Sequence, residues 1–139
     1  MSDSALARAE LVVRLTPIAP VRTGRAALET TSATLPVIVL WSTGDQPSPD
    51  QGYAAPLYTR QLSLEYKTTA SAAYDDDLDA ALSAIRAALK PALGASLLPH
   101  AIALRETSAR FFAPDISDTG ASRIAVLQIT FEIDYLERF

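Results

Sequence analysis

The residues of this chain best suited to chemistry are four aspartates near its middle. Asp75, Asp76, Asp77 and Asp79 begin a segment whose apolar residues recur at helical spacing. Hard divalent cations prefer carboxylate oxygens, so a cation site is one interpretation. A calcium-binding loop would need spaced ligands, a glycine and a distal glutamate, which this segment lacks. Carboxylates at a helix start also cap it and oppose the positive end of its dipole, and this second interpretation fits better.

His100 is the single histidine and the other residue that could act as a base or a metal ligand. It stands in a proline-flanked segment without a nucleophile motif, so we expect a surface residue. The sequence contains no nucleophile-elbow, phosphate-loop or dinucleotide fingerprint, and it has no cysteine. We therefore predict no catalytic residue, no cofactor and no bound metal, which means that the protein is not an enzyme.

The composition is that of an ordinary globular protein. The 139 residues are 49% apolar and 20% charged, which predicts a single domain over residues 1–139. A net charge of −4 without a basic cluster argues against nucleic acid as a partner. The longest apolar run, at residues 35–41, is too short to span a membrane, and the N-terminus lacks the basic start of a signal peptide. We expect a soluble protein made in the cytoplasm, without a membrane partner.

Periodicity predicts two helices and five strands. Helical spacing of apolar residues marks residues 4–15 and residues 74–93. The first of these segments has a modest apolar face of Leu6, Ala9, Val13 and Leu15, and the second has a stripe of Leu78, Leu82, Ile85 and Leu89. Polar and apolar residues alternate in 59–69 and 124–135, which indicates half-buried strands. The apolar run at 35–41 predicts a strand covered on both faces, and weaker patterns at 21–34 and 97–112 are also interpreted as strands.

The order of these elements, α-β-β-β-α-β-β, predicts an α+β fold. We expect a single, mostly antiparallel β-sheet with the helices packed on one face. The last two strands should form an antiparallel hairpin.

Residues 42–58 are rich in proline, glycine, serine and aspartate, which predicts a long loop. Loops beyond about 12–15 residues are uncommon in compact domains unless they carry a function. Aromatic residues are enriched at interfaces, although Trp41 is expected in the core. The candidate interface residues are therefore Asp45, Gln46, Asp50, Tyr53, Tyr58 and Arg60.

The polar side of the last predicted strand consists of Gln128, Thr130, Glu132 and Asp134. Such a row is either a solvated sheet face or part of a subunit contact. In the second case, Glu132 and Asp134 would pair with an arginine of a neighbouring copy, Arg60 or Arg110. Exposed pairs of this kind contribute little affinity and mainly set register.

The order and spacing of the segments resemble those of a known family. A helix leads to an apolar strand that follows Leu35-Pro36 and ends in Trp41, and a loop over residues 42–52 comes next. The strand at residues 59–66, the acidic helix start at 74–82 and a last strand ending in residues 131–135 complete the pattern. Over nearly its full length the chain resembles the tail terminator proteins of long-tailed phages and prophages, the group that includes the lambda-type minor tail protein U.

The resemblance implies a homo-oligomeric ring, expected to be a hexamer, on the end of the finished tail tube. Such a ring stops the addition of tube subunits and offers the face to which the head connector docks. The implied partners are further copies of the chain, the tail tube protein and a head–tail connector protein, at the tail–head junction of a virion. No cofactor and no catalysis are implied. The alternatives are another neck or head–tail joining protein, or a small ligand-binding domain or enzyme with a pocket around His100 or the aspartates.

Overall fold

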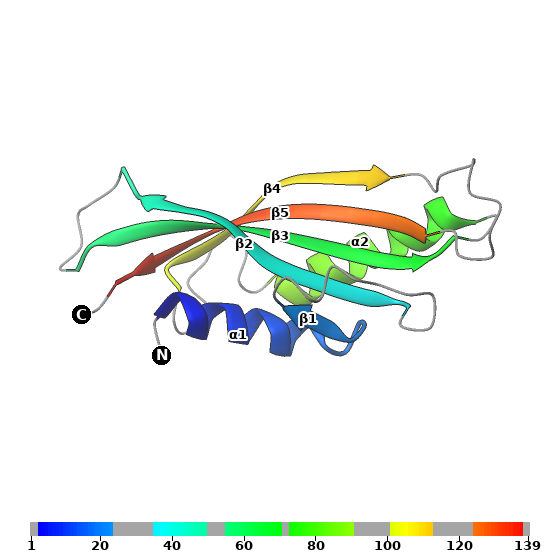
Figure 1. Ribbon diagram of the computed structural model, residues 1–139, viewed down its shortest axis with the longest axis horizontal. Coiled ribbons are helices and arrows are strands. Elements are labelled where there is room, and N and C mark those ends of the chain that lie inside the picture. The colour runs from blue at the N-terminus through cyan, green and yellow to red at the C-terminus, as the bar shows by residue number, and fades with distance from the viewer. Residues whose placement is uncertain are drawn as a thin grey trace.

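The computed structural model describes residues 3–23, 35–49, 55–70, 73–90, 101–112 and 124–137. The elements are α1 (Asp3–Leu15), β1 (Val21–Thr23), β2 (Val37–Pro47), β3 (Leu57–Thr69), α2 (Tyr74–Leu89), β4 (Ala103–Phe112) and β5 (Ile124–Leu136). The strands form one 5-stranded sheet in the order β1-β2-β3-β5-β4, and all its pairings are antiparallel except β1–β2 (Figure 1). The predicted α+β fold and element order are therefore confirmed.

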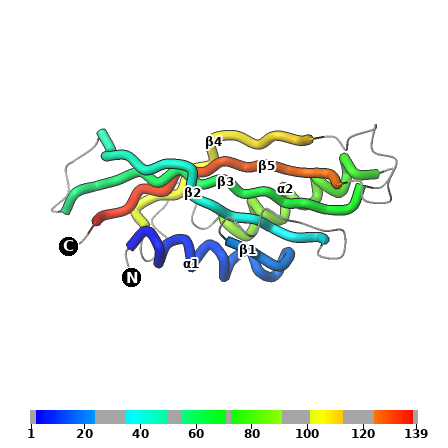
Figure 2. Tube along the Cα trace, in the orientation of Figure 1, coloured from blue at the N-terminus to red at the C-terminus, as the bar shows by residue number. Residues whose placement is uncertain are grey.

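Both helices pack on the same face of the sheet, which we call the helix-side face (Figure 2). On β5 every second residue is buried, because a strand turns alternate side chains to opposite faces. The buried set of β5 packs with the matching residues of β2 and β3 and with the apolar stripes of α1 and α2. From the strands, this core takes Ile38, Leu40, Leu62, Leu64, Leu104, Ala125, Leu127, Ile129, Phe131 and Ile133.

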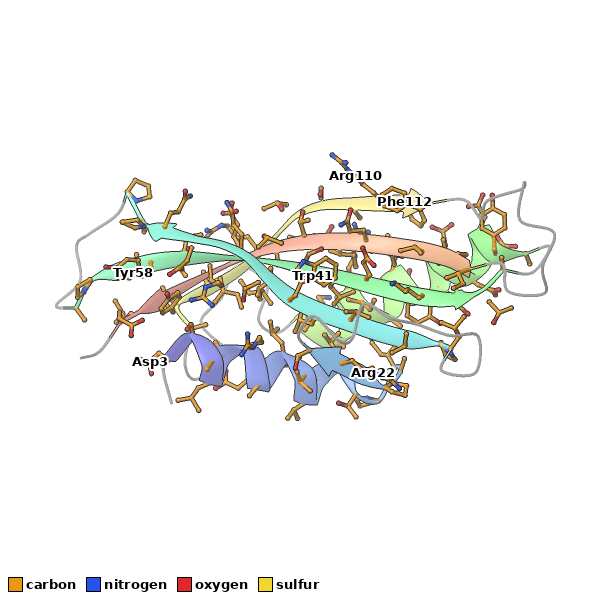
Figure 3. All side chains as sticks on the ribbon, in the orientation of Figure 1. Asp3, Arg22, Trp41, Tyr58, Arg110 and Phe112 are labelled. Atoms are coloured by element: carbon orange, nitrogen blue, oxygen red, sulfur yellow. The ribbon has the colours of Figure 1, made fainter. Side chains whose placement is uncertain are left out.

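The apolar part of β2 is buried on both faces of the sheet, as the apolar run at residues 35–41 predicted. Val37 and Val39 point away from the helices and are buried with 1% and 0% of their surfaces exposed. They form a second apolar cluster with the partly buried Leu35 and Trp41. Trp41 thus packs against a small cluster and is half-buried (Figure 3).

The buried side of α1 differs in part from the predicted one. Its buried residues are Ala7, Leu11 and Leu15, of which Leu15 was predicted. Ala9 is exposed, and Val13 keeps 73% of its surface accessible. The reason lies in the sequence: apolar residues occur all round this helix, so more than one stripe fits helical spacing, and packing against the core selects one.

The aspartates begin α2, but none of them is its N-cap residue. The residue that precedes the helix is Ala73, and no side chain there makes a capping hydrogen bond, so the capping prediction is wrong. Asp75, Asp76 and Asp77 lie in the first turn, where the positive end of the helix dipole favours carboxylates, as predicted. The helix ends at Leu89, and residues 91–93 of the predicted helix lie outside the described residues.

Part of the predicted loop at residues 42–58 is strand, namely residues 42–47 and 57–58, and its residues 50–54 lie outside the described part of the chain. β2 runs to Pro47 and β3 starts at Leu57, so the ladder continues past a bulge between Ser42 and Gly44. Among the described residues, β1 pairs with residues 38–40 of β2, and no described strand lies beside residues 42–47 on that side. Glycine and proline are tolerated on such an edge. Pairing with β3 outweighs the low strand propensity of these residues.

The remaining strands are close to their predicted positions. β1 covers the start of the segment predicted at 21–34, whose residues 24–34 lie outside the described part of the chain. β4 covers residues 103–112 of the predicted 97–112, and it forms the expected antiparallel hairpin with β5.

Candidate functional site

Four polar and aromatic side chains gather on the helix-side face, at the end of the sheet where β5 ends. Figure 3 labels one of them, Tyr58, at this end of β3. We call Asp45, Tyr58, Arg60 and Tyr135 the distal cluster. Strand register places Asp45 opposite Arg60 and Tyr58 opposite Tyr135. The Arg60 Nε lies 3.3 Å from Oδ1 of Asp45, and the Tyr135 hydroxyl donates a 2.8 Å hydrogen bond to Oδ2 of the same carboxylate. The cluster therefore links β2, β3 and β5.

Aromatic contacts complete the distal cluster. The Tyr58 and Tyr135 rings stack with their centroids 6.0 Å apart, and the Arg60 guanidinium lies 5.8 Å from the centroid of the Tyr135 ring. A guanidinium over an aromatic face is attracted by the electrons of the ring. A further hydrogen bond of 3.3 Å from Arg60 to the Ser42 hydroxyl fixes the guanidinium plane.

Protonation in the distal cluster is set by burial and by its hydrogen bonds. Burial raises the pKa of Tyr135, and the bond to Asp45 raises it further. Burial alone would lower the pKa of Arg60, but the bonds to Asp45 and Tyr135 outweigh it, so that the pKa lies above its ordinary value. At neutral pH the cluster consists of a neutral phenol and one ion pair.

A second group lies on the opposite face of the sheet, and we call it the Arg105 cluster: Thr59, Arg105, Glu132 and Asp134. Both terminal nitrogens of Arg105 donate to Asp134, with Nη2–Oδ1 at 2.9 Å, and Nη2 also lies 3.1 Å from Glu132. Thr59, whose side chain is buried, donates a 2.7 Å bond to Asp134. The bonds from Arg105, followed by that from Thr59, hold the pKa of Asp134 below its ordinary value, although burial opposes them.

The Arg105 cluster corrects the prediction made for the last strand. Glu132 and Asp134 were expected to be solvated or to pair with Arg60 or Arg110 of a neighbouring copy. Instead, they pair with an arginine of the same chain, because strand register sets Arg105 directly opposite Glu132. Arg60 binds Asp45 on the other face, and Arg110 is exposed.

Hydroxyl groups line a shallow pocket of about 220 Å³ on the same face as the Arg105 cluster. A bulge between Glu106 and Ser108 leaves Thr107 unpaired in the ladder, and its hydroxyl lies 2.7 Å from that of Thr130. The Ser108 hydroxyl lies 2.6 Å from the same oxygen. These groups satisfy one another and offer a polar surface for hydrogen bonds to a partner.

The structure brings together half of the predicted interface residues. Asp45, Tyr58 and Arg60 belong to the distal cluster, and Gln46 is exposed next to them on β2. Asp50, Tyr53 and His100 lie outside the described residues. The alternation in residues 124–135 puts Tyr135 on the side opposite Gln128, Thr130, Glu132 and Asp134, and the structure buries it there. Its hydroxyl bond to Asp45 was not predicted. Tyr135 is the last residue on the apolar side of this strand and the one with a hydroxyl group, and this could have indicated a hydrogen bond there.

The described residues contain no group of three or more histidines and acidic side chains arranged to hold a metal ion. None of the helices in the described ranges is long and apolar enough to cross a membrane. The distal cluster and the Arg105 cluster contain paired charges, hydroxyl groups and stacked rings, which the hydrogen-bonded strands hold in place. Such groups can hydrogen-bond and ion-pair with another protein surface.

No family model matches the chain, and no curated protein matches it. Among solved structures, a chain from one described as "Virion of native gene transfer agent (GTA) particle" is similar, with a TM-score of 0.47 and 13% sequence identity. The alignment covers 99% of this chain and 92% of that chain.

Proposed function

We propose that this protein is a phage tail terminator: a homo-oligomeric ring, expected to be a hexamer, that caps the tail tube. The ring stops further tube polymerisation and offers the docking face for a head–tail connector protein. It is made in the host cytoplasm and resides at the tail–head junction of the virion. The resemblance of the whole segment pattern to tail terminator proteins is the starting point of the proposal.

The observation that carries the proposal is the pair of unlike edges of the sheet. β1 lies at one edge and β4 at the other, and no described strand pairs with the outer side of either. Different patches that meet head to tail generate a closed ring when the rotation between copies closes. A domain of this shape, with both helices on one face, suits such a ring.

The two polar clusters suit the docking role. Their charges are already paired within the chain, so a partner meets a preformed surface and little ordering is needed on binding. Partly exposed ion pairs of this kind fix register more than they add affinity. We assign tube or connector contacts to the end of the sheet with Asp45, Gln46, Tyr58 and Arg60. Asp50 and Tyr53 remain predicted members of this surface.

Electron microscopy of the purified chain, mixed with tail tube subunits from the same phage or prophage, tests the proposal. Six-fold rings at tube ends, together with tubes that stop elongating when the chain is added, are the expected result. A chain that stays monomeric and leaves tube growth unchanged would refute it. Rings that bind connector particles but ignore tubes would instead favour another neck or head–tail joining protein.

A further inference from the structure

Large apolar side chains are exposed at the end of the edge strand β4. Phe111 and Phe112 keep 45% and 46% of their surfaces accessible, and Figure 3 shows Phe112 at the tip of this strand. Exposed apolar residues on an edge strand mark a surface suited to a contact, because an edge also offers unpaired backbone groups. Among the large apolar residues that the structure describes, Val13 on α1 is the other exposed one.

The two phenylalanines point to opposite faces of the sheet. Phe111 is paired with Leu127, whose side chain is in the main core, so Phe111 lies on the helix-side face. Phe112 is paired with Val126 and lies on the other face. A chain that extends the sheet beyond β4 would therefore meet one aromatic ring on each face.

A pocket lies at the opposite edge of the sheet, lined by residues of α1 and β1. Figure 1 labels these two elements. This pocket of about 260 Å³ is lined by Ala5, Arg8, Ala9, Val12 and Thr23. Its alanine and valine side chains are apolar, and its one charged group, the Arg8 guanidinium, is suited to an aromatic face. The exposed Val13 lies four residues after Ala9 on α1, and it extends the apolar surface next to the pocket.

The pocket is on the face that Phe111 requires. Thr23 is paired with Leu40, which belongs to the core on the helix-side face, so Thr23 points to that same face. The helix α1 that forms the other wall also covers this face. A sheet that continued from β1 into β4 of another copy would carry Phe111 of that copy into the space between α1 and β1.

We propose that Phe111 of one copy inserts into this pocket of the next copy, while β4 pairs with the outer edge of β1. The inference rests on the proposed ring and names its two unlike patches. Within one chain β4 runs antiparallel to β1, since β1 is parallel to β2 and the three following pairings are antiparallel. In a ring whose axis runs along the strands, neighbouring copies keep their strand directions, and the new pairing is antiparallel too.

One register satisfies both faces of the contact. If Phe111 lies opposite Thr23, antiparallel pairing places Phe112 opposite Arg22, which is exposed on β1. A guanidinium beside an aromatic ring is a favourable cross-strand pair. Insertion of Phe111 on the helix-side face and the pairing of Arg22 with Phe112 on the other face both require this register.

Cysteine cross-linking tests the contact, because the chain has no cysteine of its own. The full chain carrying Arg22→Cys and Phe112→Cys keeps the inserted Phe111 ring, and it should form a ladder of covalent oligomers on mild oxidation or with a short bismaleimide. The control carries Arg22→Cys and Gln46→Cys, with the second thiol at an exposed position at the far end of β2. We expect at least tenfold more cross-linked dimer from the first pair. Equal or absent cross-linking would overturn the contact.

A second variant separates the contact from the function. Phe111→Ser removes the inserted ring from an exposed position, so circular dichroism and thermal melting should match the wild type. We expect at least a tenfold weaker self-association, measured by analytical ultracentrifugation. If Phe111→Ser rings form and cap tubes normally, the contact is wrong and the proposed function stands. If the cross-linked rings form but do not bind tubes, the contact is right and the tail-capping function fails.

Discussion

The hydroxyl of Tyr135 on β5 donates a 2.8 Å hydrogen bond to Asp45 on β2, and so joins two strands that β3 separates. The ladder between β2 and β3 is interrupted by the bulge at Ser42 and Gly44, shortly before Asp45. Side chains therefore hold the outer half of β2 in place together with the ladder. On its other side this half of β2 has no neighbour among the described strands, because β1 pairs with residues 38–40.

Tyr135→Phe should destabilise the fold by about 1 kcal/mol, the usual net contribution of one hydrogen bond. The loss is limited because the Asp45 carboxylate keeps its ion pair with Arg60. Urea unfolding followed by circular dichroism measures the change. Tyr58→Phe is the matched control, since it removes a phenolic hydroxyl from the same ring stack without cutting the bond to Asp45. An equal loss in both variants would contradict the role of the hydrogen bond.

The same bond predicts an alkaline limit to stability. Burial, together with the hydrogen bond to Asp45, raises the pKa of Tyr135 in the folded chain. Tyrosine in the unfolded chain ionises near pH 10, so the folded state binds this proton more tightly. The contribution is complete below that pH and is lost as pH rises through the raised pKa. Free energies of unfolding measured between pH 8 and pH 11 should fall more steeply for wild type than for Tyr135→Phe.

Acid should weaken the fold through Asp134. The bonds from Arg105 and Thr59 hold the pKa of this carboxyl below its ordinary value, so the unfolded chain takes up the proton first. The stabilisation is complete above about pH 4 and is lost as pH falls through the lowered pKa. Asp134→Asn should cost about 1 kcal/mol at pH 7, because Arg105 is 41% exposed and water screens the pair.

Unfolding of Asp134→Asn, followed from pH 7 to pH 2, should show a shallower decline than that of wild type. Asp79→Asn serves as the control, because Asp79 is exposed on α2 and makes no contact with the Arg105 cluster. An acid limb that is unchanged in Asp134→Asn and altered in Asp79→Asn would contradict the assignment.

The parts of the fold that follow from local periodicity could be predicted from the sequence. A strand period of two assigns every residue of β5 to a face, and the structure buries alternate residues over the whole strand. The stripe of α2 was equally clear: the predicted Leu78, Leu82, Ile85 and Leu89 are all buried. One helical stripe and two alternating strands were enough to predict a sheet with helices on one face.

The clusters could not be predicted, because they depend on register. Tyr135 and Asp45 are 90 positions apart in the chain, and two strand pairings bring them together. Arg105 lies opposite Glu132 in the β4–β5 hairpin, and the bulge between Glu106 and Ser108 shifts the pairing of the rest of β4 by one residue. No local pattern marks either pairing. The continuation of β2 through Gly44 was missed for the same reason, since its residues favour a turn unless a partner strand is present.

The orientation of α1 gives the sharpest remaining test, because the predicted apolar side would bury Val13, whereas the structure buries Leu11 and exposes Val13. Leu11 is 1% exposed and packs in the main core, whereas Val13 is 73% exposed. Leu11→Ala should therefore destabilise the fold by about 2–5 kcal/mol, through lost burial and the cavity left behind. Val13→Ala should change the free energy of unfolding by less than about 0.5 kcal/mol. Chemical denaturation of the two variants distinguishes the sides, and a larger loss for Val13→Ala would show that α1 is rotated in the folded chain.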